Sequence, residues 1–186
     1  MINYPNKKTI STTKKEYINY GKRGMKLEDA INITNSYYLD NNIAVIYKKP
    51  TPIQIIKLDS QKGRIVDAFF KSPSTTDYNG IYKEKYIDFE AKETQNKTSF
   101  PLANIGHHQI QHLKKVKEHG AIAFVIIYFS KLDEIYFLDA NYLVCCYNDT
   151  TKKSIPYAYI KEHGHLIKQS YFQRVDYLKI IDEYYL

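Results

Sequence analysis

Cysteine is nearly absent from this sequence, since only Cys145 and Cys146 occur and they are neighbours. Adjacent cysteines rarely bond to each other because the ring strains the backbone, and two thiols cannot complete a zinc site. We therefore expect no disulfide framework, which is typical of a reducing compartment. The pair is interpreted as small residues of a buried segment.

Long apolar runs are also missing. The longest, AIAFVIIYF at residues 121–129, is far shorter than the roughly 20 residues that a membrane-spanning helix needs. Residues 1–17 lack the apolar segment of a secretory signal. These absences predict a cytoplasmic protein with no membrane partner.

Arginine is scarce as well, because Arg23, Arg64 and Arg174 are the only three among 27 basic residues. The 20 acidic residues leave a formal net charge of +7. A positive excess attracts polyanions regardless of their sequence, which favours a nucleic-acid partner. The many Lys, Asn, Ile and Tyr residues also fit an A- and T-rich genome, so charge alone does not decide the partner.

The 186 residues, 44% of them hydrophobic, predict one folded domain with a real core. Residues 1–22 are polar and basic without apolar periodicity, and we expect a flexible arm. Such an arm either lies on a phosphate backbone or is a solvated tail. Residues 23–186 would then form a single domain.

The apolar patterns predict helices and strands in alternation. Helical spacing runs from Met25 to about Asn41, and IAVIYK at residues 43–48 indicates a buried strand. Residues 54–58 and 64–70 flank a DSQKG turn and predict a protruding hairpin stalk at about 54–70.

The second half of the chain continues this alternation. A helix is expected at residues 107–119, strands in AIAFVIIYF and EIYFLD, and a helix in RVDYLKIIDEYYL near the end. The order predicts an α/β fold with a mixed central sheet flanked by helices.

The stretch YIDFEAKET, residues 86–94, contains the candidate catalytic side chains. In an extended strand Asp88, Glu90 and Lys92 would share one face, and the apolar residues between them would face a core. Asn79-Gly80 predicts a turn that brings Asp77 back towards Glu90. Asp88 lies nearer that turn, and we expect a solvated or supporting role for it.

Two carboxylates with a lysine beside them are sufficient groups for metal-dependent phosphodiester hydrolysis. Carboxylates are the hard oxygen ligands that Mg²⁺ prefers, and an ammonium group can stabilise charge on the reacting phosphate. The alternative is an ordinary charged strand face. His107, His108 and His112 do not complete a zinc set, and polar helix histidines are the better interpretation.

Five blocks of the sequence are distinctive: YPNKKT (4–9), RGMKLEDAIN (23–32), NIAVIYKKPTPIQI (42–55), STTDYNGIYKEKYIDFEAKETQNKTSFPL (74–102) and HHQIQHL (107–113). In this order they closely resemble RecU-type Holliday junction resolvases, which belong to the PD-(D/E)xK nuclease superfamily. The resemblance is strongest from Arg23 to Phe129 and weakest after Asn148. Two features depart from the pattern: the hairpin region is shorter than usual, and Thr76 stands where the superfamily has proline before the first acid.

The resemblance implies a PD-(D/E)xK-like fold and a role for each site residue. Mg²⁺, with Mn²⁺ able to substitute, would be held by Thr75, Asp77, Glu90 and Gln109, the two neutral residues acting through side chain or backbone. Lys92 matches the lysine that stabilises the transition state. Glu28 matches an acid that supports the ligands or binds a second metal, although a plain helix N-terminal acid is an equal alternative.

The resemblance also implies a homodimeric, magnesium-dependent endodeoxyribonuclease that nicks four-way DNA junctions in recombination and repair, with recombination proteins as further partners. Lys57, Lys62 and Arg64 of the stalk, and Arg23 beside the site, are candidate phosphate contacts. Arg23 could instead pair with an acid. Two alternatives stay open: a related nuclease that cuts linear duplex DNA, and a non-catalytic junction-binding module.

Overall fold

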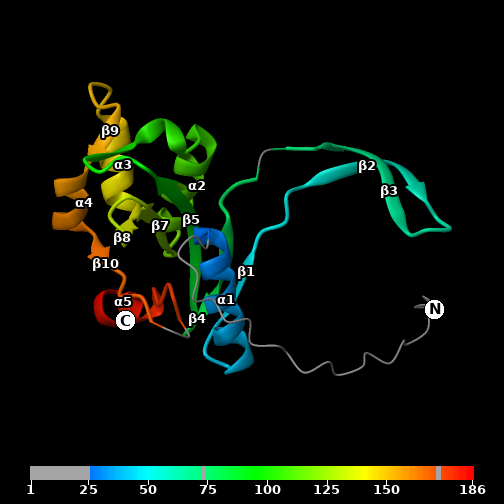
Figure 1. The fold of residues 1–186 in the computed structure, drawn as a ribbon, viewed down its shortest axis with the longest axis horizontal. Helices are drawn as coiled ribbons and strands as arrows, with labels where there is room; N and C mark the ends of the chain where they lie inside the picture. The colour runs from blue at the N-terminus through cyan, green and yellow to red at the C-terminus, as the bar shows by residue number, and fades with distance from the viewer. Residues whose placement is uncertain (1–25, 73, 171–172) are drawn as a thin grey trace.

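The computed structural model describes residues 26–72, 74–170 and 173–186 (Figure 1). The expected arm at 1–22 and Arg23 lie outside the described residues. In chain order the elements are α1 (Leu27–Asp40), β1 (Val45–Lys48), β2 (Ile53–Asp59), β3 (Arg64–Phe70), β4 (Tyr78–Tyr82), β5 (Lys85–Thr94), β6 (Ser99–Pro101), the 3-10 helix η1 (Leu102–Asn104), α2 (His107–Glu118), β7 (Ile122–Phe129), β8 (Glu134–Asp139), α3 (Ala140–Asn148), β9 (Ser154–Pro156), α4 (Tyr157–His163), β10 (His165–Leu166) and α5 (Leu178–Tyr184).

A six-stranded sheet with the order β1-β4-β5-β7-β8-β10 forms the centre of the molecule. Strands β5 and β7 pair in parallel, and the other neighbours pair antiparallel, so the sheet is mixed, as predicted. Helices α1 and α5 cover one face, and α2, α3 and α4 cover the other (Figure 1). The α/β fold with helices on both faces of a mixed sheet is therefore confirmed.

Alternation along the central strands supplies both cores. In β7, Phe124 and Ile126 face α1 and α5, whereas Val125 and Ile127 face α2 and α3. Both faces of β7 are thus buried, which accounts for its continuous apolar run. On the α1 side a column of stacked rings joins Tyr78, Phe89, Phe124 and Phe137, with neighbouring ring centroids 4.8, 4.7 and 4.0 Å apart.

The turn between β4 and β5 is not where the sequence predicted it. Asn79 and Gly80 lie inside β4, and the chain reverses at Lys83 and Glu84, which have φ of 44° and 64°. Positive φ at both central residues is typical of a type I′ hairpin turn. Gly80 serves another purpose: a Cβ there would lie 2.6 Å from the Cα of Ile46, so glycine lets β1 approach β4 closely.

The predicted hairpin stalk is present as β2 and β3, which pair antiparallel as a separate sheet. It projects from the body in Figure 1, and almost every residue in it is exposed. The reversal is fixed by Asp59, whose Oδ1 accepts the N–H groups of Gln61 and Lys62 at 3.1 Å, and by Gly63 at φ +60°.

Two further expectations need correction. The strand predicted at 43–48 as buried is β1 at the edge of the sheet, where Val45 and Tyr47 are exposed. Cys146 is buried but Cys145 is exposed, because the segment is a helix with one solvent face. None of the helices in the described part of the chain is long and apolar enough to cross a membrane.

Gly80→Ala is expected to lower the free energy of unfolding by about 2 kcal/mol or more, because the new methyl group pushes β1 away from β4. Urea denaturation measures the change. Gly63→Asn is the matched control, since Gly63 has no atom within 4 Å of a built Cβ and asparagine tolerates its positive φ. Equal stability of the two variants would contradict the close approach of β1.

Candidate active site

The pairing of β4 with β5 brings the two acids together. Tyr78 is opposite Phe89, so Asp77, just before β4, meets Glu90 in the middle of β5. The backbone N–H of Asp77 donates to Oε2 of Glu90 at 3.1 Å, and the backbone N–H of Ala91 donates to Oδ2 of Asp77 at 3.2 Å. Each carboxylate is therefore anchored to the strand that carries the other.

Two more side chains converge on the second oxygen of Glu90. Nζ of Lys92 lies 2.5 Å from Oε1, and Nε2 of Gln109 donates to the same atom at 2.8 Å. Gln109 is held in turn, because its Oε1 accepts the N–H of Gly106 at 2.9 Å, where α2 begins. Lys92 follows Glu90 by two residues on one strand face, as the alternation predicted.

Burial and repulsion change the acidity of Glu90. The side chain is fully buried, and burial followed by the nearby charge of Asp77 raises the pKa of Glu90 from 4.5 to about 8. Lys92 opposes this rise by favouring the charged form. Additional positive charge near Glu90 would therefore favour its ionised form.

Thr75 and Glu28 lie at the edge of this group. The exposed Thr75 accepts a hydrogen bond through Oγ1 from Nζ of Lys49 at 3.2 Å. Glu28, in the first turn of α1, forms an ion pair with Lys48 at the surface. The hydroxyl of Tyr78 donates to the backbone oxygen of Glu28 at 3.3 Å, and burial followed by the charges of Glu28 and Asp77 raises the pKa of Tyr78. Glu28 therefore lies beside Tyr78, the residue that follows Asp77.

Of the two roles expected for Asp88, solvated or supporting, the structure excludes the solvated one. It is fully buried and is contacted by Lys49, Thr76, Tyr86 and His112. The strand alternation put Asp88 on the same face as Glu90 but did not show that α2 covers this face. The signal for His112 was present, since it follows Gln109 by three residues and so lies near it on the helix surface.

The residues present fit a divalent cation with oxygen ligands. Two carboxylates meet at one point, and their repulsion is the condition that a bound cation relieves. Within the described residues no group of three His, Cys, Asp or Glu side chains is placed to hold a metal ion, which also leaves the histidines of α2 without a zinc-type set. A cation between Asp77 and Glu90 would therefore need neutral oxygens to complete its shell. Gln109 is hydrogen-bonded to Glu90, and Thr75 is two residues before Asp77 in the chain.

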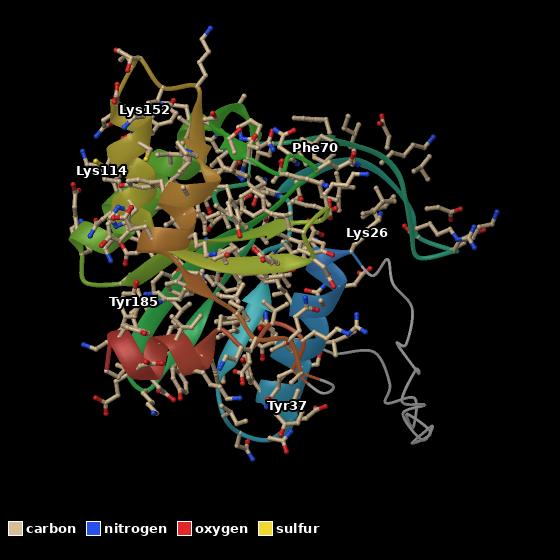
Figure 2. The ribbon with its side chains drawn as sticks, turned by 60° about the vertical axis from the view of Figure 1, so that its left-hand side comes forward. Lys26, Tyr37, Phe70, Lys114, Lys152 and Tyr185 are labelled. Carbon is tan, nitrogen blue, oxygen red and sulfur yellow. The ribbon has the colours of Figure 1, made fainter. Side chains whose placement is uncertain are left out.

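The candidate DNA contacts are separate from this site. Lys57 and Arg64 lie in the strands of the stalk and Lys62 in its turn, on the part of the chain that projects in Figure 1. In the view of Figure 2, Phe70 at the end of the stalk and Lys26 before α1 lie on one side of the body, opposite Lys114 and Lys152.

Glu90→Gln is expected to raise the thermal stability of the metal-free protein at about pH 9. Because the folded-state pKa of Glu90 is raised, the folded form loses stability as pH rises from 4.5 to about 8, on the order of 2–4 kcal/mol in all. Glutamine resembles the neutral acid and avoids this loss. Calorimetry with a chelator should show a difference that shrinks as the pH falls towards about 5.

Glu93→Gln is the control, because Glu93 lies on the same strand and is exposed. A Glu90→Gln protein that melts below the wild type at about pH 9 would contradict the buried, repelled carboxylate.

Comparisons with known proteins identify the family of the chain. Residues 22–183 match the family model described as "RecU: Recombination protein U". A protein of Bacillus cytotoxicus named Holliday junction resolvase RecU is 52% identical over 99% of this chain and 98% of its own length. A Geobacillus protein of the same name is 48% identical over 100% of this chain and 98% of its own.

Among solved structures, the Holliday junction resolvase Hjc of Archaeoglobus fulgidus matches with a TM-score of 0.41 and 12% identity, over 71% of this chain and 92% of that one. This likeness is too distant to add to the assignment. The family match and the full-length relatives are sufficient by themselves: the chain belongs to the RecU family.

Proposed function

We propose that this chain is a structure-selective endodeoxyribonuclease that resolves four-way DNA junctions by paired, magnesium-dependent nicks in recombination and repair. The observation that carries the proposal is the meeting of Asp77, Glu90 and Lys92 at one point, in a chain alignable from end to end with relatives named Holliday junction resolvase. DNA as the substrate implies action in the cytoplasm, alongside recombination proteins.

Asp77 and Glu90 would hold Mg²⁺ or Mn²⁺, with neutral oxygens from Thr75 and from the backbone of Gln109, whose side-chain oxygen already accepts from Gly106. When bound, the cation supplies an acidified water and neutralises charge on the phosphate. Gln109 holds Glu90 in place, since its amide donates to Oε1 while its own oxygen is fixed by Gly106. The two backbone N–H bonds keep both carboxylates facing the same point.

Lys92 provides the positive charge that belongs to the chain itself. Its ammonium lies 2.5 Å from Glu90 and its side chain is 25% exposed, so it can reach both the carboxylate and a phosphate in solvent. A donor placed before the reaction stabilises the negative charge that develops on the phosphate without further rearrangement. Glu28, through Tyr78, supports this arrangement from α1.

The stalk supplies the selectivity for branched DNA in this proposal. A two-stranded hairpin is only marginally stable alone, yet β2 and β3 expose Ile56, Leu58, Val66 and Phe70, at 57–75% of their surface. A second copy of the chain would cover part of this apolar surface, and a two-fold dimer matches the approximate symmetry of a four-way junction. Lys57, Lys62 and Arg64 would then contact phosphates near the branch point, and Arg23 is proposed as a further phosphate contact.

Two other functions are compatible with the same residues. A nuclease for linear duplex DNA would use the same carboxylates without needing the stalk. A non-catalytic junction-binding protein would need the stalk but not the carboxylates, and the assembled Asp77, Glu90 and Lys92 argue against it.

The deciding experiment compares nicking of a synthetic four-way junction with nicking of linear duplexes of the same sequence, in magnesium, in calcium and without metal. We expect junction cleavage in magnesium that is at least about a hundredfold faster than duplex cleavage, and none without metal. Glu90→Gln should reduce cleavage by at least about a thousandfold and leave junction binding nearly unchanged. Equal cleavage of junction and duplex would overturn the proposal.

Replacing Lys57, Lys62 and Arg64 together by glutamine is expected to weaken junction binding about tenfold or more at physiological salt. Each lost phosphate contact should reduce the slope of log K against log salt by about 0.9, as measured by titrations at several salt concentrations. Lys114→Gln with Lys152→Gln is the control, since these lysines lie on the opposite side of the body (Figure 2). The same loss of binding in the control would show that net charge, and not the stalk, determines affinity.

A further inference from the structure

A buried polar cluster lies directly beside the two acids, and three of its members, Lys49, Thr76 and Asp88, are named here the clamp. Nζ of Lys49 donates to Oδ2 of Asp88 at 2.7 Å and to Oγ1 of Thr76 at 2.5 Å. It also donates to Oγ1 of Thr75 at 3.2 Å and lies 3.5 Å from Nε2 of His112. An ammonium group has three donors, so these partners take up all of its hydrogen-bonding capacity.

The carboxylate of Asp88 completes the clamp from β5. Its Oδ1 accepts a hydrogen bond from the hydroxyl of Thr76. Its Oδ2 accepts from Tyr86 at 2.9 Å and lies 3.1 Å from Nε2 of His112, in addition to Lys49. Removing these charges from water is costly, and apolar side chains of similar size often stabilise a fold as well or better. Stability alone therefore does not account for a buried ion pair at this position.

The clamp holds the short segment that carries two of the proposed ligands. Thr76 lies between Thr75 and Asp77, and its buried hydroxyl is the link from this segment to both Lys49 and Asp88. The backbone N–H of Lys49 donates to the carbonyl oxygen of Asp77 at 2.7 Å. Side-chain and backbone bonds from Lys49 therefore fix three consecutive residues against β5.

The clamp also lies where the stalk joins the body. Lys49 immediately precedes Pro50 on the chain leading to β2, and the returning chain reaches Thr75 shortly after β3 ends at Phe70. The two arms of the stalk are thus joined through Lys49 at the same place where the segment approaches Glu90.

We propose that Lys49, Thr76 and Asp88 are positioning residues that set the Thr75–Asp77 segment at the distance from Glu90 that a divalent cation requires. The inference rests on the proposed function in one respect, that Thr75, Asp77 and Glu90 are the ligands. It assigns Thr76 no contact with the cation itself. Its hydroxyl acts by keeping Asp77 and Thr75 in place.

The test compares Thr76→Val with Thr76→Ser in the full chain. Valine keeps the shape of threonine without the hydroxyl, whereas serine keeps the hydroxyl, so only valine should open the clamp. Electron paramagnetic resonance of free Mn²⁺ measures metal affinity without any need for cleavage. We expect Thr76→Val to weaken Mn²⁺ binding at least about tenfold and Thr76→Ser to remain within about threefold of the wild type. Metal-free junction binding should be unchanged in both.

Lys49→Met provides the second measurement and should weaken Mn²⁺ binding in the same direction. Its effect should not add to that of Thr76→Val, because both changes remove the same links. Lys179→Met is the matched control, since Lys179 of α5 pairs with another buried carboxylate, that of Asp176, at 2.8 Å. Should Lys49→Met fail to fold, the pair of Thr76 variants decides alone.

Wild-type Mn²⁺ affinity in Thr76→Val, or equal weakening in Thr76→Val and Thr76→Ser, would overturn the clamp. A wild-type protein that binds no Mn²⁺ would also overturn the clamp. Junction selectivity is measured separately, so a chain that cuts linear duplex equally well would overturn the proposed function and leave the Mn²⁺ comparison standing.

Discussion

The antiparallel pairing of β4 with β5 is the constraint on which the site depends. The turn at Lys83–Glu84 sets the register, and this register brings Asp77 to Glu90. A shift by one residue would turn the charged face of β5 towards the core formed with α1 and α5. Gly80 allows β1 to pack against this pair, and β7 supports β5 from the other side. The chemistry thus depends on a backbone arrangement in the middle of the sheet.

Two buried carboxyl groups on one strand face give this sheet an unusual interior. Glu90 is paired with Lys92, and Asp88 is paired with Lys49, so each carboxylate has its own lysine. Burying a charged side chain inside the sheet lowers the free energy of unfolding, whereas apolar side chains at the same positions would not. The two stacked apolar layers on either side of the sheet offset this cost. The protein therefore gives up stability at the centre of β5, as expected of a site that must bind and hold charge.

In the proposed resolvase the body carries the catalytic residues and the stalk carries the candidate DNA contacts. The body is closed on both faces of its sheet and holds the carboxylates through hydrogen bonds, whereas the stalk exposes apolar and basic side chains. Lys49 connects the two parts, since it leads into the stalk and also bonds to the segment that carries Asp77. The full-length similarity to RecU relatives fits this joint use of both parts.

The sequence by itself determined which residues of β5 share a face, that β7 is buried, and that a hairpin follows residues 50–52. These features show in a period of two, in a continuous apolar run and in turn residues, respectively. It misplaced the reversal at Asn79–Gly80, where glycine allows a close approach of β1 instead of a turn. Only the tertiary structure decided that Asp88 is buried and that Lys49 is its partner. The reason is physical: periodicity shows which side chains point the same way, but the chain segments that cover them come from 24 and 39 residues away.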